Sequence, residues 1–214
     1  MTDHPILLNT EMVRAILDGR KTQTRRVVMP QPPEIWNQCR PIKNSEDIII
    51  SWCFENKDDP VLHGYKKCPY GKVGDRLWVR EKFAIHPRFK TTLYRADGNE
   101  FKDAAGFGVW KPTWKPSIYM PKLATRIWLE VTGIRVQRVP EISEEDAKAE
   151  GCETEDVRCQ DLMGSGNWKN FPLYKAGFKS LWDSINKKRG YGWESNPWVW
   201  VIEFKQIDMK GGKK

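Results

Sequence analysis

The stretch Ile16-Leu17-Asp18-Gly19-Arg20-Lys21-Thr22-Gln23-Thr24-Arg25-Arg26 contains a change from helical to extended patterning. In the residues before Gly19, apolar side chains recur at helical spacing, and Thr10 can cap that helix. Gly19 stands where a glycine ends a helix, and residues 22–28 are rich in the β-branched side chains that are typical of a strand. The sequence therefore predicts a helix followed directly by a strand, with residues 20–26 gathered at one edge of the fold.

The rest of the chain alternates between strand patterns and a few helical ones. Residues 144–150 follow Ser143, a capping residue, and residues 174–188 carry an apolar stripe at helical spacing, so both segments are predicted to be helices. Gly133 interrupts the longest strand pattern and predicts a bulge or bend. Strands that follow one another without regular helical crossovers favour an α+β fold with a curved, mixed or antiparallel β-barrel and two or three flanking helices. The predicted strands are residues 6–8, 22–28, 48–54, 76–82, 91–96, 127–139 and 198–207.

The composition indicates a basic protein with a hydrophilic surface. Of the 214 residues, 36 are Lys or Arg and 28 are Asp or Glu, which gives a net charge of +8 and favours a partner that carries phosphates. The sequence has no apolar run long enough to span a membrane, and its start has neither a basic segment nor a sustained apolar one. We therefore expect a cytoplasmic protein that does not bind membranes.

The five cysteines predict free thiols rather than disulfides. They occur at positions 39, 53, 68, 152 and 159, an odd count with irregular spacing and no Cys-x-x-Cys pair. A zinc site made by Cys39, Cys53, His63 and Cys68 is conceivable, but the spacing matches no standard zinc motif. We therefore expect no metal and no organic cofactor.

The cationic stretch that follows Gly19 is the first candidate for chemistry. The neighbouring arginines Arg20, Arg25 and Arg26 disfavour a charged Lys21 ammonium, and so would burial, so that Lys21 can serve as a base. Thr24 offers a hydroxyl for such a base to activate, and Glu150 is a candidate acid for the leaving amine. The alternative is a solvated or phosphate-binding face, because on a regular strand positions 21 and 24 point to opposite sides. The two side chains can cooperate only if the chain turns or bulges between them.

Further residues are candidates for binding a nucleic acid or a nucleoside. Arg80 could reach a phosphate and Glu81 could pair with a cation at the same cleft, or both could belong to an ordinary salt-bridged rim. Trp110 and Trp114 lie in a Lys- and Pro-containing loop, which makes them candidates for stacking on a base.

Four segments resemble motifs of ASCH-domain proteins, a family of the PUA-like superfamily. Residues 16–25 are similar to the opening motif of the family, in which a helix ends in Gly-Arg-Lys-Thr before a strand. Residues 73–77 (Val-Gly-Asp-Arg-Leu) resemble its Gly-Asp strand start, residues 142–151 its helix ending in Glu, and residues 200–204 its last strand. Over nearly its full length the chain looks like the longer ASCH proteins of phages and prophages.

This resemblance implies a PUA-like β-barrel with a cleft that faces a nucleic acid. Some small ASCH proteins are amidohydrolases that remove the acetyl group from N4-acetylcytidine, and their catalytic Lys, Thr and Glu match Lys21, Thr24 and Glu150 by motif position. In that chemistry Lys21 takes the proton of Thr24, Thr24 attacks the acetyl carbonyl, and Glu150 passes a proton to the cytosine amine. Other members are ribonucleases or RNA-binding modules, so a metal-independent ribonuclease and a non-catalytic reader of RNA or of modified bases remain alternatives.

The chain departs from the small amidohydrolases by its length. We expect one domain over residues 1–209 with insertions near 30–67, 98–116 and 152–170, followed by a disordered basic tail at 210–214. The insertions could cap the cleft, enlarge it for a polynucleotide or bind a partner. They leave the substrate open, because a shared fold does not establish a shared function.

Overall fold

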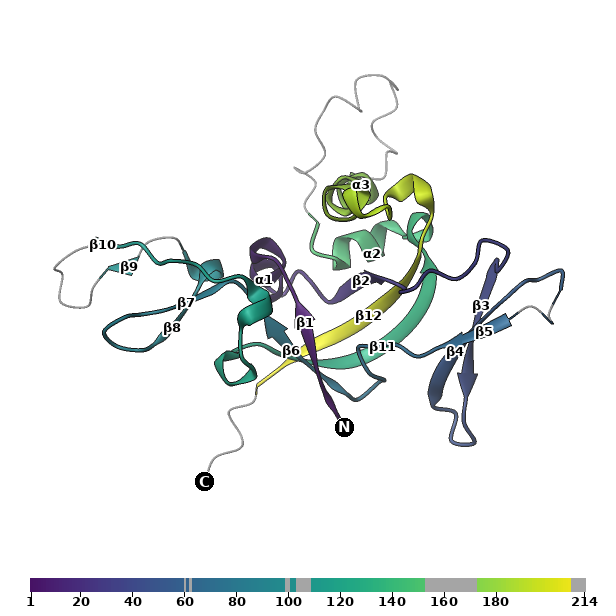
Figure 1. Cartoon of the computed structure of the whole chain (residues 1–214), viewed down its shortest axis with the longest axis horizontal. Helices are drawn as coiled ribbons and strands as arrows, with labels where there is room; N and C mark the ends of the chain where they lie inside the picture. Colours follow the sequence, from purple (N-terminus) through teal and green to yellow (C-terminus); the bar gives the residue numbers. More distant parts are fainter. Residues whose placement is uncertain (60, 62, 99–100, 103–108, 153–172, 209–214) are drawn as a thin grey trace, which may run out of the picture.

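The computed structural model describes residues 1–59, 61, 63–98, 101–102, 109–152 and 173–208 (Figure 1). Its centre is a five-stranded sheet in the order β1-β6-β11-β12-β2. The β1 and β6 strands run parallel and the other neighbours run antiparallel, so the sheet is mixed. The bounds of its strands are β1 Asp3–Leu7, β2 Gln23–Val27, β6 Arg76–Arg80, β11 Trp128–Arg138 and β12 Trp198–Ile207.

The two long strands β11 and β12 are neighbours inside this sheet. Their pairing runs from Trp128 opposite Ile207 to Arg138 opposite Trp198, with a register shift between Val131 and Gly133. A Cβ atom at Gly133 would lie 2.5 Å from a carboxylate oxygen of Glu203, so a larger residue there would displace the Glu203 side chain. The bulge predicted at Gly133 is confirmed.

Within the described residues three α-helices flank the sheet, in agreement with the two or three that were predicted. Helix α1 (Thr10–Leu17) is capped by Asn9, whose side chain accepts from the Met12 backbone N–H at 2.8 Å, and not by Thr10 as the sequence suggested. Helix α2 (Glu144–Ala149) begins after Ser143, which accepts from the Asp146 N–H as expected. Helix α3 (Leu173–Asn186) lies beside α2 over the same part of the sheet (Figure 1).

The buried residues form two apolar clusters. The first contains residues of β1, β6, β11, β12 and α1 together with residues of β4 (Ile49–Glu55), and includes Leu77, Leu129 and Phe54. The second fills the space between α2, α3 and β12, with Phe178 and Trp182 packed near Val201. Helix α3 is therefore held on the sheet by its apolar stripe, as its sequence pattern predicts.

Residues 30–67 contain a second sheet instead of the loops expected on both sides of residues 48–54. Here β3 (Gln38–Lys43), β4 and β5 (His63–Lys66) pair antiparallel in that order. The Phe54 ring meets Trp198 edge to face with centroids 5.6 Å apart, and Trp52 meets Trp200 at 6.2 Å. This segment is thus part of the main core.

A further extension leads away from the sheet on the side of α1 (Figure 1). It contains two short hairpins, β7 (Phe83–Ile85) with β8 (Thr92–Tyr94), and β9 (Phe101–Lys102) with β10 (Val109–Trp110). The predicted insertion at 152–170, apart from Cys152, and the tail at 210–214 lie outside the described residues. Short 3₁₀ helices complete the fold: Arg95–Asp97, Ser117–Tyr119, Lys122–Ala124, Val139–Glu141, Lys187–Arg189 and Trp193–Ser195.

The α+β class and the mixed sheet are confirmed. Within the described part of the chain the sheet does not close into a barrel through strand pairing, because β1 and β2 are its two edges. These edges are instead bridged by a side chain, since Arg26 on β2 donates to the Leu7 carbonyl on β1 at 2.9 Å. Among the described helices, none has the length and apolarity needed to cross a bilayer.

Candidate functional site

Lys21 is positioned by the way in which α1 ends. Gly19 adopts a left-handed φ of 72°, and the backbone N–H groups of Arg20 and Lys21 both donate to the Ala15 carbonyl, at 2.8 and 3.0 Å. The chain then forms an isolated antiparallel bridge between Lys21 and Glu150 before β2 begins at Gln23. Because β2 starts only after this bridge, the strict alternation of a regular strand does not separate Lys21 from Thr24.

Glu150 reaches the same place from the end of α2. It is the C-cap residue of that helix, and its backbone N–H donates to the Asp146 carbonyl at 2.9 Å. The next residue, Gly151, has a φ of 81°, and a Cβ atom there would lie 2.9 Å from the Ala15 Cβ and 3.1 Å from the Lys21 Cβ. Glycine at 151 therefore allows the end of α2 to approach Lys21 closely.

Lys21 and Glu150 form a buried ion pair. The Lys21 Nζ lies 2.6 Å from Glu150 Oε2 and 2.8 Å from the Glu150 carbonyl oxygen, and the two side chains are 0% and 3% exposed. The other carboxylate oxygen, Oε1, accepts from Arg25 Nη1 at 3.0 Å. Burial lowers the pKa of Lys21 below its ordinary value, while the charge of Glu150 opposes this shift.

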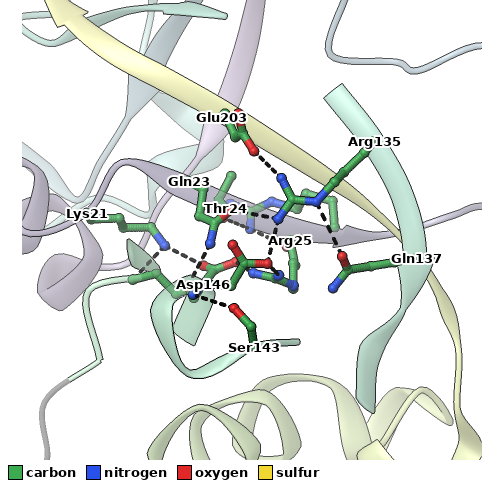
Figure 2. Close-up of polar contacts among 11 residues, drawn as sticks. Lys21, Gln23, Thr24, Arg25, Arg135, Gln137, Ser143, Asp146 and Glu203 are labelled. Carbon is green, nitrogen blue, oxygen red and sulfur yellow. Dashed lines mark hydrogen bonds and ion pairs between the residues drawn. The ribbon is translucent and has the colours of Figure 1, made fainter. Parts of the chain in front are cut away.

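A network of charges surrounds this pair. Arg25 donates to Asp146 Oδ2 at 2.7 Å, and Figure 2 shows Arg135 reaching from β11 to Asp146, where its Nη2 lies 2.5 Å from the same oxygen. The Gln23 side chain donates to the Asp146 carbonyl, and Glu203 forms an ion pair with Arg135. Burial alone would raise the pKa of Asp146, but these donors lower it, so the carboxylate is held ionised between two arginines.

Thr24 is oriented by Arg26. Arg26 Nη1 donates to Thr24 Oγ1 at 2.7 Å and to the Arg25 carbonyl at 2.8 Å. Within the described residues, both hydrogen bonds of Lys21 Nζ go to Glu150, and none joins it to Thr24 Oγ1. The Thr24 oxygen thus accepts from a permanent cation, an arrangement that would stabilise negative charge on that oxygen.

Thr24 and Glu150 line one hollow of about 520 Å³. Arg25, Arg26 and Arg80 line it too, and helix α3 supplies an opposite apolar wall. This volume lies within the range of small-molecule sites, and an apolar wall facing a few polar groups is typical of them. The residues of α3 and the turn after it that face the hollow are Phe178, Leu181, Trp182, Ile185, Asn186 and Arg189.

Among the predicted binding residues whose side chains the structure describes, Arg20, Glu81 and Trp114 do not line this hollow. Arg20 is exposed and pairs with Asp18 at 3.0 Å, and it also donates to the Gly151 carbonyl. Glu81 is 1% exposed, and each of its carboxylate oxygens accepts a hydrogen bond from Arg126, at 2.9 and 3.0 Å. This pairing matches the alternative in which Glu81 belongs to a salt-bridged rim. Trp114 lies under Arg95, with 5.5 Å between the guanidinium and the ring centroid, and Trp110 belongs to β10, with its side chain outside the described part.

No group of three or more His, Cys, Asp or Glu side chains in the described part of the chain is arranged to hold a metal ion. Cys39, Cys53 and Cys68 are free thiols, and Cys159 lies outside the described residues. Burial raises the pKa of Cys39 and of Cys68 to about 12, so both stay protonated at neutral pH and are poor metal ligands in this state.

Sequence reasoning did not assign the α3 wall to the site. The stripe of Phe178, Leu181, Trp182 and Ile185 was predicted only as the apolar face of a helix. Phe178, Leu181 and Trp182 belong to the second apolar cluster, and all four residues line the hollow. Arg189 directly follows the predicted helix at residues 174–188 and was not assigned to the site. The signal that could have identified it is its position at the end of the helix whose stripe covers the site.

Comparison with known proteins gives one solved structure to report. The chain is similar to an ASCH domain from Lactobacillus crispatus, described as a high-resolution crystal structure, with 12% sequence identity and a TM-score of 0.38 over 96% of this chain and 79% of that one. No protein-family model matches the sequence, and no curated protein matches it. The similarity to ASCH-domain proteins is therefore carried by the sequence motifs at residues 16–25, 73–77, 142–151 and 200–204.

Proposed function

We propose that this chain is an ASCH-type hydrolase that removes the acyl group from N4-acetylcytidine or a related modified base. The observation that carries the proposal is the buried contact of 2.6 Å between Lys21 and Glu150, together with the hollow that both Glu150 and Thr24 line. Its partner is a nucleoside or RNA, its location is the cytoplasm, and the mechanism uses neither a metal nor an organic cofactor.

The short contact supplies a path for the protons of the reaction. With Lys21 neutral and Glu150 a carboxylate, the Lys21 amine accepts the proton of Thr24 while Thr24 Oγ1 attacks the acyl carbonyl carbon. Lys21 passes this proton to Glu150 across the short contact. The bond from the carbonyl carbon to N4 then breaks, the amine leaves with the proton from Glu150, and Lys21 and Glu150 are again an amine and a carboxylate. Water hydrolyses the Thr24 ester and releases the acid.

Two features of the resting site bear on this mechanism. Arg26 already donates to Thr24 Oγ1, which favours the developing oxyanion of the nucleophile. Lys21 Nζ is bonded to Glu150 through both the carboxylate and the carbonyl, so attack requires it to exchange one of these bonds for Thr24. Catalytic hydrogen bonds of this kind often tighten only when substrate is bound.

The test is to incubate the purified protein with N4-acetylcytidine and to follow release of cytidine and acetate. Thr24→Val, which keeps the shape of the side chain and removes the hydroxyl, should abolish turnover, whereas Thr24→Ser should retain part of it. Turnover by Thr24→Val at the rate of the natural protein would contradict Thr24 as the nucleophile. No turnover by the natural protein would contradict the hydrolase itself.

A second candidate, a non-catalytic reader of RNA or of modified bases, is favoured by one observation. The Lys21 ammonium is 0% exposed and both of its bonds go to Glu150, which is also how a purely structural pair would look. A reader would bind RNA in a salt-sensitive manner, keep that binding in Thr24→Val, and form no product. A metal-independent ribonuclease would instead cut RNA and leave N4-acetylcytidine intact.

A further inference from the structure

The hollow beside Thr24 contains more positive charge than its own carboxylate can balance. Among the described residues that line it, four are arginines and one, Glu150, is an acid. The Glu150 carboxylate is already bonded to Lys21 and to Arg25. Arg25 is further matched by Asp146, so the excess charge belongs to the other three arginines.

These three arginines have no carboxylate partner within the described part of the chain. Arg26 donates to neutral oxygens only, those of Thr24, Arg25 and Leu7. Arg80 donates to the Ile118 carbonyl and lies over the Trp78 ring, 5.2 Å from its centroid, and its Nε atom is buried without a hydrogen-bond partner. Arg189 is exposed after α3 and faces the same hollow. Three unmatched guanidinium groups around one hollow favour an anionic ligand.

We infer that Arg80 and Arg189 form a phosphate subsite of this hollow, so that the substrate is a phosphate ester of the acylated nucleoside rather than the free nucleoside. This inference rests on the proposed function and specifies its substrate class. Arg26 is engaged by Thr24, so it marks the end of the hollow where the acyl group reacts, while the apolar wall of Phe178 and Leu181 suits the base. The phosphate comes from a mononucleotide or from the backbone of RNA.

The experiment compares kcat/KM for three substrates: N4-acetylcytidine, its 5′-monophosphate, and a short RNA that contains one N4-acetylcytidine. We expect kcat/KM of the natural protein to be at least about tenfold higher for the phosphorylated substrates. A tenfold ratio corresponds to the contribution of about one charge-assisted hydrogen bond. A higher value for the RNA than for the monophosphate identifies the backbone as the source of the phosphate, and the reverse order identifies the mononucleotide.

Arg189→Gln and Lys188→Gln form a matched pair, because both remove one exposed positive charge and only Arg189 lines the hollow. Arg189→Gln should abolish the preference for the phosphorylated substrates, and Lys188→Gln should keep that preference. Equal use of nucleoside and nucleotide by the natural protein, or equal effects of the two substitutions, would overturn the subsite.

A binding measurement separates this inference from the hydrolase proposal. If the natural protein turns over none of the three substrates, titration with cytidine and with cytidine 5′-monophosphate still tests the subsite through the affinity ratio. Tighter binding of the monophosphate that is lost in Arg189→Gln would support the subsite in a reader without catalysis. Equal affinities for the two ligands would overturn the subsite in that case as well.

Discussion

Lys21 and Glu150 lie 129 positions apart in the sequence, yet the Lys21 Nζ and a Glu150 carboxylate oxygen are 2.6 Å apart in the interior of the fold. The contact joins the end of α1 to the end of α2 through an isolated bridge between the two backbones. Removing one partner of a buried ion pair leaves a charge without its counter-charge, and this commonly costs more than the pair contributes. The pair should therefore behave as one thermodynamic unit.

A double-mutant cycle measures that coupling. Lys21→Met and Glu150→Leu should each lower the free energy of unfolding by about 3–5 kcal/mol, as expected when one member of a buried pair is lost. The double variant should lose clearly less than the sum of the two, because no unpaired charge remains between the two positions. Urea unfolding of all four proteins gives the values. Additive losses would show that the two charges are not coupled.

The exposed Arg20→Gln is the control for this cycle. Arg20 neighbours Lys21 in the sequence but pairs with Asp18 at the surface. Its substitution should change the free energy of unfolding by no more than about 0.5 kcal/mol.

The pH dependence of deacylation should report the burial of Lys21. Burial lowers the pKa of Lys21 from its ordinary value of 10.5, and the base must be neutral to act. The neutral fraction increases with pH, so kcat should rise with pH and level off below pH 10.5. Lys21→Arg, which retains the charge and cannot lose it, should fold and be inactive at every pH.

Thr24→Ser serves as the control for the pH profile, because it retains the hydroxyl and Lys21. Its rate should be lower with the same midpoint. A natural profile that does not change with pH, or an active Lys21→Arg, would contradict Lys21 as the base.

The fold was predictable where local patterns agree with the tertiary structure. The β-branched and aromatic residues of the segment 198–207 predicted β12, and Gly133 predicted the bulge in β11. The strand β3 was not predicted, because it is polar and contains Pro41, and its conformation comes from pairing with β4 at the edge of a small sheet. An edge strand is where a proline is tolerated, but it leaves little hydrophobic pattern.

The residues of the candidate site were proposed from the sequence, but their contacts were not predictable. The motif resemblance proposed Lys21, Thr24 and Glu150 together, but no periodicity in a single sequence indicates that the ends of two helices meet. For the same reason the sequence did not show that Glu81 pairs with Arg126. The two residues are 45 positions apart, and their contact depends on the fold of the chain between them. The same limit applies to Arg189, which reaches the hollow only because α3 packs on the sheet.

Gly151 should be required for the geometry of the site. Alanine at 151 would adopt an unfavourable φ of 81° and would place its Cβ 3.1 Å from the Lys21 Cβ. We expect Gly151→Ala to lower both stability and deacylation. Gly190→Ala is the matched control, since Gly190 has a φ of 83° and nothing within 4 Å of an added Cβ.

Differential scanning calorimetry and kcat together test this expectation. The control should lose about 1–2 kcal/mol through backbone strain alone and keep its activity. Gly151→Ala should lose more than the control and have a lower kcat. Equal stabilities and equal rates of the two variants would mean that the approach of Gly151 to Lys21 is unimportant.

Phe54 should be a core residue of the whole domain, although it lies in a segment that the sequence suggested was an insertion. Its side chain is fully buried and contacts Trp198 and Trp200 of β12. Phe54→Ala should lower the free energy of unfolding by about 3–5 kcal/mol, the usual cost of emptying a buried aromatic site. Tyr65→Ala is the control, because Tyr65 lies opposite Cys53 in the same small sheet and is 60% exposed.

If residues 30–67 were a separable insertion, Phe54→Ala would unfold that segment alone, and tryptophan fluorescence of the remaining domain would keep its unfolding midpoint. A single shifted transition, seen by both fluorescence and circular dichroism, is the outcome expected of one cooperative core.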